Sequence, residues 1–269
     1  MQIISIQDDK RFLYFINQHV DRTDFRFKYL ISFLNMAFGR GEATVTGNTS
    51  IYKLRDEWVI YIETERQLFI YGSDNPVIID ALSNNINLEM FAGYEIMGDY
   101  DLVYRLLHHQ NAQGYTIIKD RIFYTLGHSD KLLQALDDTQ PNQNDIDELT
   151  KMMLDYYVEE YDGTRSKTEE MIRPTIVKHI NRNSIHIYRE AGIIKSFCTV
   201  INPDVGILYT KPDFRNQHIG KRLLSTCSRV ILTQKNTCFV MTDMKNIPSN
   251  KICVDIGYEE ISKHTNIRL

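Results

Sequence analysis

Apolar and polar residues follow helical and strand-like spacings in turn along the first half of the chain. Apolar residues recur every three or four positions where a helix is expected, and they alternate or run together where a strand is expected. The pattern predicts helices over residues 9–19 and 24–38, a loop over 39–50, strands over 51–63 and 66–72, helices over 76–84 and 98–110, and a strand over 114–127.

The second half has a clearer order. It begins with a helix whose apolar stripe is formed by Ile146, Leu149, Met153, Leu154 and Tyr157. The pattern then predicts a helix over 168–181, strands over 184–192, 193–203 and 205–210, a helix over 219–231, a strand over 238–243, a helix over 248–257 and a last strand over 259–268. This order is typical of an α/β fold with helices packed on a mixed sheet.

A polar segment separates the two halves. LDDTQPNQNDIDE, residues 136–148, is acidic, contains a proline and has few apolar residues, as linkers do. The composition therefore predicts two domains, residues 1–135 and 148–269, joined by a linker over 136–147.

Composition excludes several protein classes. The chain has 269 residues, 43% hydrophobic and 25% charged, as soluble globular proteins do, and its net charge of −4 favours neither nucleic acid nor membrane surfaces. The start of the sequence has no basic leader, and no apolar run reaches the length of a membrane span. The four cysteines have no metal-binding spacing, so we expect a cytoplasmic protein with reduced thiols and no metal.

The loop in YTKPDFRNQHIGKRLL, residues 209–224, is the strongest candidate for chemistry. A strand passes through this short loop into a helix, whose first backbone N–H groups have no partner within the helix and can bind an anion. Gly220 allows close approach, and Arg215, Lys221 and Arg222 add positive charge. A pyrophosphate would suit such a loop; the alternative is a solvated helix start with no ligand.

Two segments resemble the GCN5-related N-acetyltransferase (GNAT) superfamily. VGILYTKPDFRNQHIGKRLL is similar to its acetyl-CoA motif of strand, proline, Arg/Gln-x-x-Gly-x-Gly/Ala and helix, with Arg215, His218 and Gly220 at the motif positions. TDMKNIPSNKICVDIGYEE is similar to a second family segment, through Asn246, Ser249, Asn250, Gly257 and Tyr258. The resemblance extends from about residue 145 to the C-terminus.

The resemblance implies a GNAT fold, with a splayed mixed sheet flanked by helices, and an acetyl-CoA-dependent N-acetyltransferase acting on an amine of a small molecule or peptide. Pantetheine would enter between the strands GILYT and CFVMTD, and pyrophosphate would lie on the loop. The implied cofactor-binding residues are Leu208, Tyr209, Thr210, Arg215, Asn216, Gln217, His218, Ile219, Gly220, Lys221, Asn246 and Asn250.

Two residues depart from the family pattern. His218 replaces the middle glycine, where it could crowd the pyrophosphate, contact a phosphate or point to solvent. Cys253 stands where many relatives have a tyrosine that protonates the departing thiolate, so it is our candidate catalytic residue; the alternative is a small buried core residue. Glu159 and Glu160 are candidate bases, or simply solvated charges at a helix end.

The first half lacks a comparable phosphate loop, since Gly39-Arg40-Gly41 is only a weak echo of one. Its helix-helix-strand order is similar to that of the degenerate GNAT-like half found in two-domain members of the superfamily. Such a half could form one side of the acceptor cleft or hold a homodimer together. Two rival functions stay open. One is an acyl-CoA sensor without catalysis, and the other is a tandem-domain aminoacyl transferase that uses charged tRNA.

Overall fold

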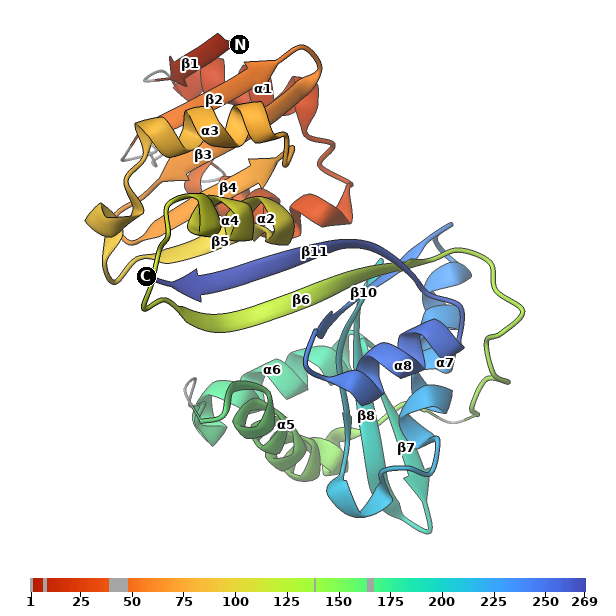
Figure 1. Ribbon diagram of the computed structural model, residues 1–269. Helices are drawn as coiled ribbons and strands as arrows, with labels where there is room; N and C mark the ends of the chain where they lie inside the picture. Colours follow the sequence, from red (N-terminus) through yellow and green to blue (C-terminus); the bar gives the residue numbers. More distant parts are fainter. Residues whose placement is uncertain (1, 7–8, 39–47, 138, 164–166) are drawn as a thin grey trace. The chain divides into compact units, whose positions relative to one another are not determined.

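The computed structural model describes residues 2–6, 9–38, 48–137, 139–163 and 167–269 (Figure 1). The chain forms two compact units. The N-terminal unit consists of Met1–Phe123, Asp243–Lys245 and Ile261–Leu269, and the C-terminal unit consists of Tyr124–Thr242 and Asn246–Glu260. The predicted linker, residues 136–147, lies within the C-terminal unit, and the predicted loop over 39–50, with Gly39-Arg40-Gly41, lies mostly outside the described residues.

The N-terminal unit is a mixed sheet with helices. Its helices are α1 (Asp9–His19), α2 (Lys28–Phe38), α3 (Pro76–Asn85) and α4 (Tyr100–His109), with short 3-10 turns at Phe25–Phe27 and Leu88–Phe91. Its strands are β1 (Gln2–Ile6), β2 (Thr49–Leu54), β3 (Glu57–Glu63), β4 (Gln67–Gly72), β5 (Glu95–Asp99), β6 (Thr116–Leu126) and β11 (Glu259–Arg268). Their order in the sheet is β1-β2-β3-β4-β5-β11-β6, and the chain passes into the C-terminal unit within β6.

The last strand of the chain belongs to the N-terminal unit. Strand β11 pairs antiparallel with β5, from His264 opposite Asp99 to Arg268 opposite Glu95. It lies between β5 and β6, so the C-terminal segment supplies an interior strand of this sheet.

Each face of the N-terminal sheet has its own core, because successive side chains of a strand point to opposite faces. Along β3, Val59 and Tyr61 pack in a cluster with α3 and α4, whereas Ile60 and Ile62 pack in a cluster with α1 and α2. The four side chains are all buried, which explains why this strand has no polar face.

The C-terminal unit repeats this architecture. Its helices are α5 (Ile146–Tyr161), α6 (Glu169–Asn181), α7 (Ile219–Leu232) and α8 (Ile247–Asp255), with 3-10 turns at Gln143–Asp145 and Pro212–Phe214. Its strands are β7 (Ile185–Glu190), β8 (Ile193–Ile201), β9 (Asp204–Thr210) and β10 (Cys238–Asp243), in the order β10-β9-β8-β7. Helices α5 and α6 share one core cluster with β7, β8 and β9.

The order of elements occurs twice in the chain. The series α1-α2-β2-β3-β4-α3-β5-α4-β6 is matched by α5-α6-β7-β8-β9-α7-β10-α8-β11. The predicted α/β class with two similar halves is therefore confirmed. The sequence pattern missed β1 and β5; β5 is a five-residue strand, EIMGD, without a clear alternation.

Candidate cofactor site

A β-bulge shapes the middle of β9. Cys198 of β8 lies opposite Leu208 and Val200 lies opposite Val205, so two residues of β9 oppose the single residue Thr199. The Thr199 hydroxyl accepts a hydrogen bond from the Ile207 N–H at 2.8 Å. A side chain at Gly206 would place its Cβ 2.5 Å from that hydroxyl oxygen. The bulge therefore requires glycine here and bends the strand.

Strands β9 and β10 separate beyond this bulge. They run parallel, and the residue pair recorded between them within the described chain is Asp204 with Phe239, ahead of the bulge. The Tyr209 carbonyl accepts a hydrogen bond from the Ser196 hydroxyl of β8 at 2.7 Å, so it faces β8. Because backbone groups alternate in direction along a strand, those of Leu208 and Thr210 face the opposite edge. That edge can pair with an extended ligand.

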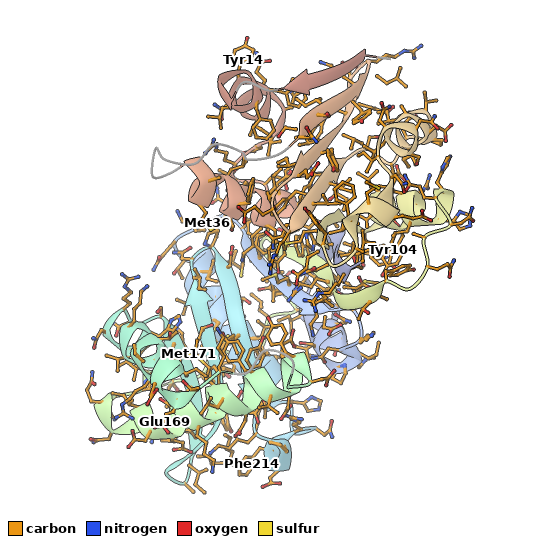
Figure 2. All side chains as sticks on the ribbon, turned by 90° about the vertical axis from the view of Figure 1, so that its left-hand side faces the viewer. Tyr14, Met36, Tyr104, Glu169, Met171 and Phe214 are labelled. Atoms are coloured by element: carbon orange, nitrogen blue, oxygen red, sulfur yellow. The ribbon has the colours of Figure 1, made fainter. Side chains whose placement is uncertain are left out.

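The loop after β9 presents a row of backbone donors. The 3-10 turn Pro212–Phe214 follows β9, and α7 begins at Ile219. Phe214, labelled in Figure 2, lies in this turn under the ammonium of Lys195, 4.8 Å from its ring centre. Among the described contacts, the backbone N–H groups of residues 216–221 donate no hydrogen bond to the protein. Successive free N–H groups at a helix N-terminus form a concave anion site.

Two left-handed residues turn the loop so that its N–H groups converge. Asn216 has φ 61°, and His218 has φ 58° and ψ 10°. Glycine adopts this conformation most easily, which is the physical reason for a glycine at the position of His218 in the family motif. Histidine is among the side chains that tolerate it. The His218 side chain is exposed, so its imidazole could reach either a phosphate or solvent, and all three alternatives stay predictions.

Gly220 fixes the distance between α7 and the end of β9. A Cβ at this residue would lie 3.2 Å from the Thr210 hydroxyl and 3.8 Å from a methyl group of Leu208. The helix start therefore lies directly against the strand edge that the bulge opens. The donor loop and the free edge of β9 are therefore neighbours.

Arg215 is held at the mouth of this site. Its Nη2 donates to both carboxylate oxygens of Glu159 of α5, at 2.7 and 2.9 Å, and its Nε donates to the Thr210 carbonyl at 2.9 Å. The Tyr209 hydroxyl also donates to Glu159, at 3.2 Å. Burial, and then the negative charge of Glu159, raise the pKa of Tyr209 to about 12. The sequence does not reveal that Glu159 contacts Arg215, because 56 residues separate them.

Asn246 and Asn250 order the start of α8. The Asn246 side chain caps the helix by accepting from the Ser249 N–H at 3.1 Å. The Asn250 side chain accepts a hydrogen bond from the hydroxyl of Thr242, the buried residue near the end of β10. The second of these bonds connects α8 to β10, and the cofactor-binding role of both asparagines stays a prediction.

Cys253 is the residue of α8 whose side chain is buried in the core. Its side chain is only 1% exposed, and burial raises the pKa of its thiol to about 12. Such a thiol is a weak acid in this closed surrounding, so the burial argues against the predicted catalytic role, which stays untested. Tyr258 is a core residue as well, since its hydroxyl contacts Ser228 at 2.8 Å and the sulfur of Cys238 at 3.0 Å.

The described residues lack both a metal-ligand cluster and a membrane-spanning helix. They contain no group of three or more His, Cys, Asp or Glu side chains arranged to hold a metal ion. Across the same residues, every helix is too short or too polar to cross a bilayer.

Comparison with known proteins agrees with this geometry. Residues 200–268, which include the donor loop and α8, match the FR47-like protein family. A GNAT-family acetyltransferase from Colwellia psychrerythraea is similar in structure over 100% of this chain and 98% of its own, with a TM-score of 0.59 and 13% identity. A GCN5-related N-acetyltransferase from Sphaerobacter thermophilus covers 94% of this chain and 88% of its own, with a TM-score of 0.55 and 12% identity. No curated protein matches the sequence.

The match of residues 200–268 covers the two segments whose motifs carry the resemblance to the superfamily, and the structural similarity extends over the full length. The identities of 12–13% make this a similarity of fold. The chain is therefore a GNAT-fold protein with an FR47-like C-terminal segment.

Proposed function

We propose that the protein is an acetyl-CoA-dependent N-acetyltransferase that modifies an amine of a small molecule or peptide. The observation that carries the proposal is the row of free backbone N–H groups over residues 216–221, next to the open edge of β9. These donors suit a pyrophosphate, and the backbone groups of Leu208 and Thr210 suit the amides of pantetheine. The GNAT fold, which typically holds an acyl-CoA between these two strands, supports the same reading.

Binding of the cofactor would rearrange Arg215. In the structure its guanidinium holds Glu159 and the Thr210 carbonyl. A phosphate competes well for a guanidinium, because its oxygens can accept two parallel charge-assisted hydrogen bonds from the guanidinium fork. Transfer of Arg215 to phosphate would free the Thr210 carbonyl for the ligand and leave Glu159 with the Tyr209 hydroxyl as its hydrogen-bond donor but without its cation.

The chemistry then needs few further groups. Bound acetyl-CoA supplies a thioester whose carbonyl carbon an amine can attack. The freed Glu159 could accept the amine proton, directly or through water. As the new C–N bond forms, the thioester C–S bond breaks, and CoA leaves as a thiolate that takes up a proton from Glu159 or from water. The Thr210 N–H faces the open edge of β9, where it could stabilise negative charge that develops on an acyl oxygen.

Calorimetric titration of acetyl-CoA into the purified protein tests the proposal. We expect saturable binding, and we expect Gly220→Glu to weaken it at least about 100-fold, because the carboxylate repels phosphate and fills the space beside Thr210. Asn236→Glu is the matched control: it adds the same charge at an exposed residue beyond the end of α7 and should leave binding unchanged. Circular dichroism checks that both variants fold. Absence of binding by the unaltered protein would refute the proposal.

An acyl-CoA sensor is the second candidate, favoured by the burial of Cys253, which leaves no thiol acid at the expected place. Release of free CoA thiol in the presence of a panel of primary amines separates the two functions. Turnover supports the enzyme. Tight binding without turnover for any amine supports the sensor.

A further inference from the structure

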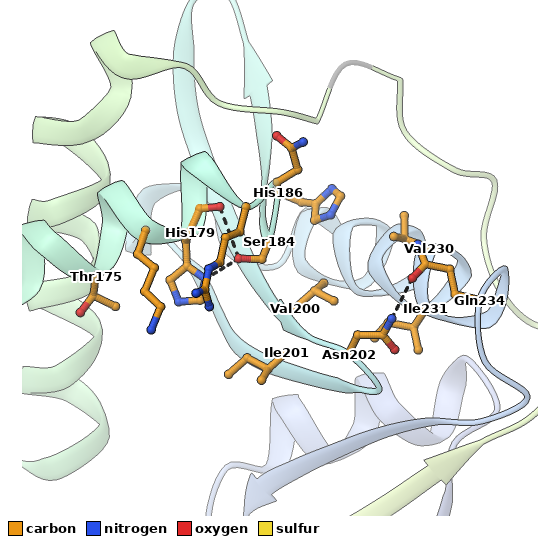
Figure 3. Close-up of a pocket in the computed structure, with 13 residues that line it drawn as sticks. Thr175, His179, Ser184, His186, Val200, Ile201, Asn202, Val230, Ile231 and Gln234 are labelled. Carbon is orange, nitrogen blue, oxygen red and sulfur yellow. Dashed lines mark hydrogen bonds between the residues drawn. The ribbon is translucent and has the colours of Figure 1, made fainter.

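A second cavity lies in the C-terminal unit, away from the cofactor loop. It has a volume of about 570 Å³ and is formed where α6 ends, β7 begins and α7 ends (Figure 3). Val230, Ile231 and Gln234 contribute to it from the last turn of α7 and just beyond. The cofactor loop meets the first turn of the same helix, roughly 17 Å away at 1.5 Å per residue. The two sites are therefore separate.

The polar wall of this cavity is cationic. Lys178, His179 and Arg182 line it, and its lining contains no Asp or Glu. Neither Lys178 nor Arg182 forms an ion pair within the described residues. Burial, and then the positive charges of Lys178 and Arg182, lower the pKa of His179, so the neutral imidazole is favoured and both of these cations lie close to it.

The partial negative charge at the C-terminus of α6 does not by itself explain why Lys178 and Arg182 lie there. Basic side chains often offset the partial negative charge of a helix C-terminus. Here, backbone N–H groups already satisfy the last carbonyls: Arg182 donates to Lys178, Asn183 to Ile180 and Ser184 to His179. The ammonium and guanidinium groups therefore keep their donors for another partner.

The opposite wall is apolar. Val200, Ile201, Val230 and Ile231 line it, and Ile201 is 60% exposed, which is unusual for a large aliphatic side chain. Asn202 donates to Gln234 at 2.8 Å across one end of the cavity, and the His179 ring contacts the Ser184 hydroxyl at 2.8 Å (Figure 3). These four polar side chains are thus already paired, whereas Lys178 and Arg182 form no ion pair among the described residues.

We propose that this cavity binds a small organic oxyanion that has an apolar body. The anionic group, a phosphate monoester or a carboxylate, lies between Lys178 and Arg182, and the apolar body lies on the aliphatic wall. A volume of about 570 Å³ is within the usual size of small-molecule sites. Arg182 provides the forked donor that both oxyanions accept.

Titrations with model ligands test this site by calorimetry or saturation-transfer NMR. Phenyl phosphate and benzoate carry the two oxyanions on the same ring, and benzyl alcohol is the neutral control. We expect phenyl phosphate or benzoate to bind at least about tenfold more tightly than benzyl alcohol, because charge-assisted hydrogen bonds add to the contact with the ring. Whichever of the two binds more tightly identifies the anionic group.

Two variants address the two walls. The double substitution Lys178→Ala with Arg182→Ala should weaken oxyanion binding at least about tenfold, and Val230→Trp should block it by filling the cavity. Lys151→Ala removes an exposed cation of α5 and should change nothing. Acetyl-CoA binding should be unchanged in all three variants, which keeps this test independent of the proposed function.

Several results would overturn the proposal. They are no saturable binding of either oxyanion, equal binding of benzyl alcohol, equal affinity in the double variant, or an equal loss in Lys151→Ala. The last two would show that the anion binds to surface charge in general rather than in the cavity.

Discussion

Each unit contains two neighbouring parallel strands, and their ends differ. In the N-terminal unit, β4 and β5 stay paired from Gln67 opposite Glu95 to Ile70 opposite Gly98. The Asp99 carboxylate then accepts the Gly72 N–H at 2.7 Å and holds the two ends together. In the C-terminal unit, the bulge opposite Thr199 parts β9 from β10. One pair of strands is closed and the other is open.

The helices that follow β4 and β9, α3 and α7, differ in the number of free backbone N–H groups at their starts. At α3, the Asn75 side chain accepts the Val77 N–H and Pro76 has no N–H to offer, so few donors remain. At α7, His218 makes no side-chain cap and the first N–H groups stay free. The cavity of about 720 Å³ at the ends of β4 and β5 is also acidic. Its carboxylates include those of Asp21, Asp24, Asp56, Glu57, Asp74, Asp99 and Asp101.

The comparison shows how one order of elements can have two different chemistries. A phosphate is favoured where the strands are open, the helix start is uncapped and the loop is basic, and it is disfavoured where all three features are reversed. This difference supports the prediction that the N-terminal half is a GNAT-like copy without the cofactor site.

The largest expected effect is on stability, and it concerns Asp99, which holds the ends of β4 and β5 together in the N-terminal unit. Burial raises the pKa of Asp99 from 3.8 to about 7; Asp24 and Asp101 add to the increase, whereas the Gly72 N–H and Arg26 oppose it. The folded state therefore holds this proton more tightly than the unfolded state, and stability falls as the pH rises from about 4 to about 7. Asp99→Asn should increase the free energy of unfolding at pH 8 by on the order of 2–4 kcal/mol. At pH 4 the same substitution should hardly change the free energy of unfolding.

Urea denaturation at both pH values measures this effect. Glu89→Gln, at an exposed residue of the same unit that has no ion pair among the described contacts, is the control for a general change of charge. Equal stabilisation by Asp99→Asn at pH 4 and pH 8 would contradict the expectation.

A smaller effect on stability is expected from a substitution opposite the bulge that parts β9 from β10. Thr199→Val keeps the shape of a buried side chain and removes the hydroxyl that accepts the Ile207 N–H. We expect a loss of about 1–3 kcal/mol in stability, because the Ile207 N–H is left without its partner. We also expect weaker acetyl-CoA binding, because the bulge shapes the edge of β9. Thr199→Ser restores the acceptor and should recover both. Full affinity in Thr199→Val would show that the bulge does not depend on this bond.

The pairing of Arg215 with Glu159 is expected to oppose cofactor binding slightly. Both side chains are about two-fifths exposed, so the pair contributes only about 0.2–1 kcal/mol. Glu159→Gln should therefore tighten acetyl-CoA binding about two- to fivefold, as measured by calorimetry, and lower turnover if Glu159 accepts the proton. Glu160→Gln, the adjacent carboxylate, serves as the control. Weaker cofactor binding in Glu159→Gln would contradict the exchange of Arg215.

The smallest effect is expected at His218. Because the residue is left-handed and its ring is exposed, His218→Gly should relieve backbone strain and change stability by no more than about 1 kcal/mol. Acetyl-CoA affinity should stay within about twofold. A loss of more than tenfold would show that the imidazole itself contacts the cofactor.

Local spacing was enough to predict much of the fold. The helix predicted over residues 9–19 coincides with α1, and the last strand predicted over 259–268 coincides with β11. The motif residues 215–220 identified the loop that presents free donors. These features depend on neighbours within a few residues, and the sequence pattern contains that information.

Contacts between distant residues were decided only by the tertiary structure. The spacing of apolar residues predicts that β11 is a strand, but not that it pairs with β5 in the N-terminal unit. Nor does it show that Glu159 holds Arg215, or that the ends of α6 and α7 enclose a cationic cavity. Sequence periodicity determines which face of an element is buried, whereas packing across the whole chain determines what that face meets.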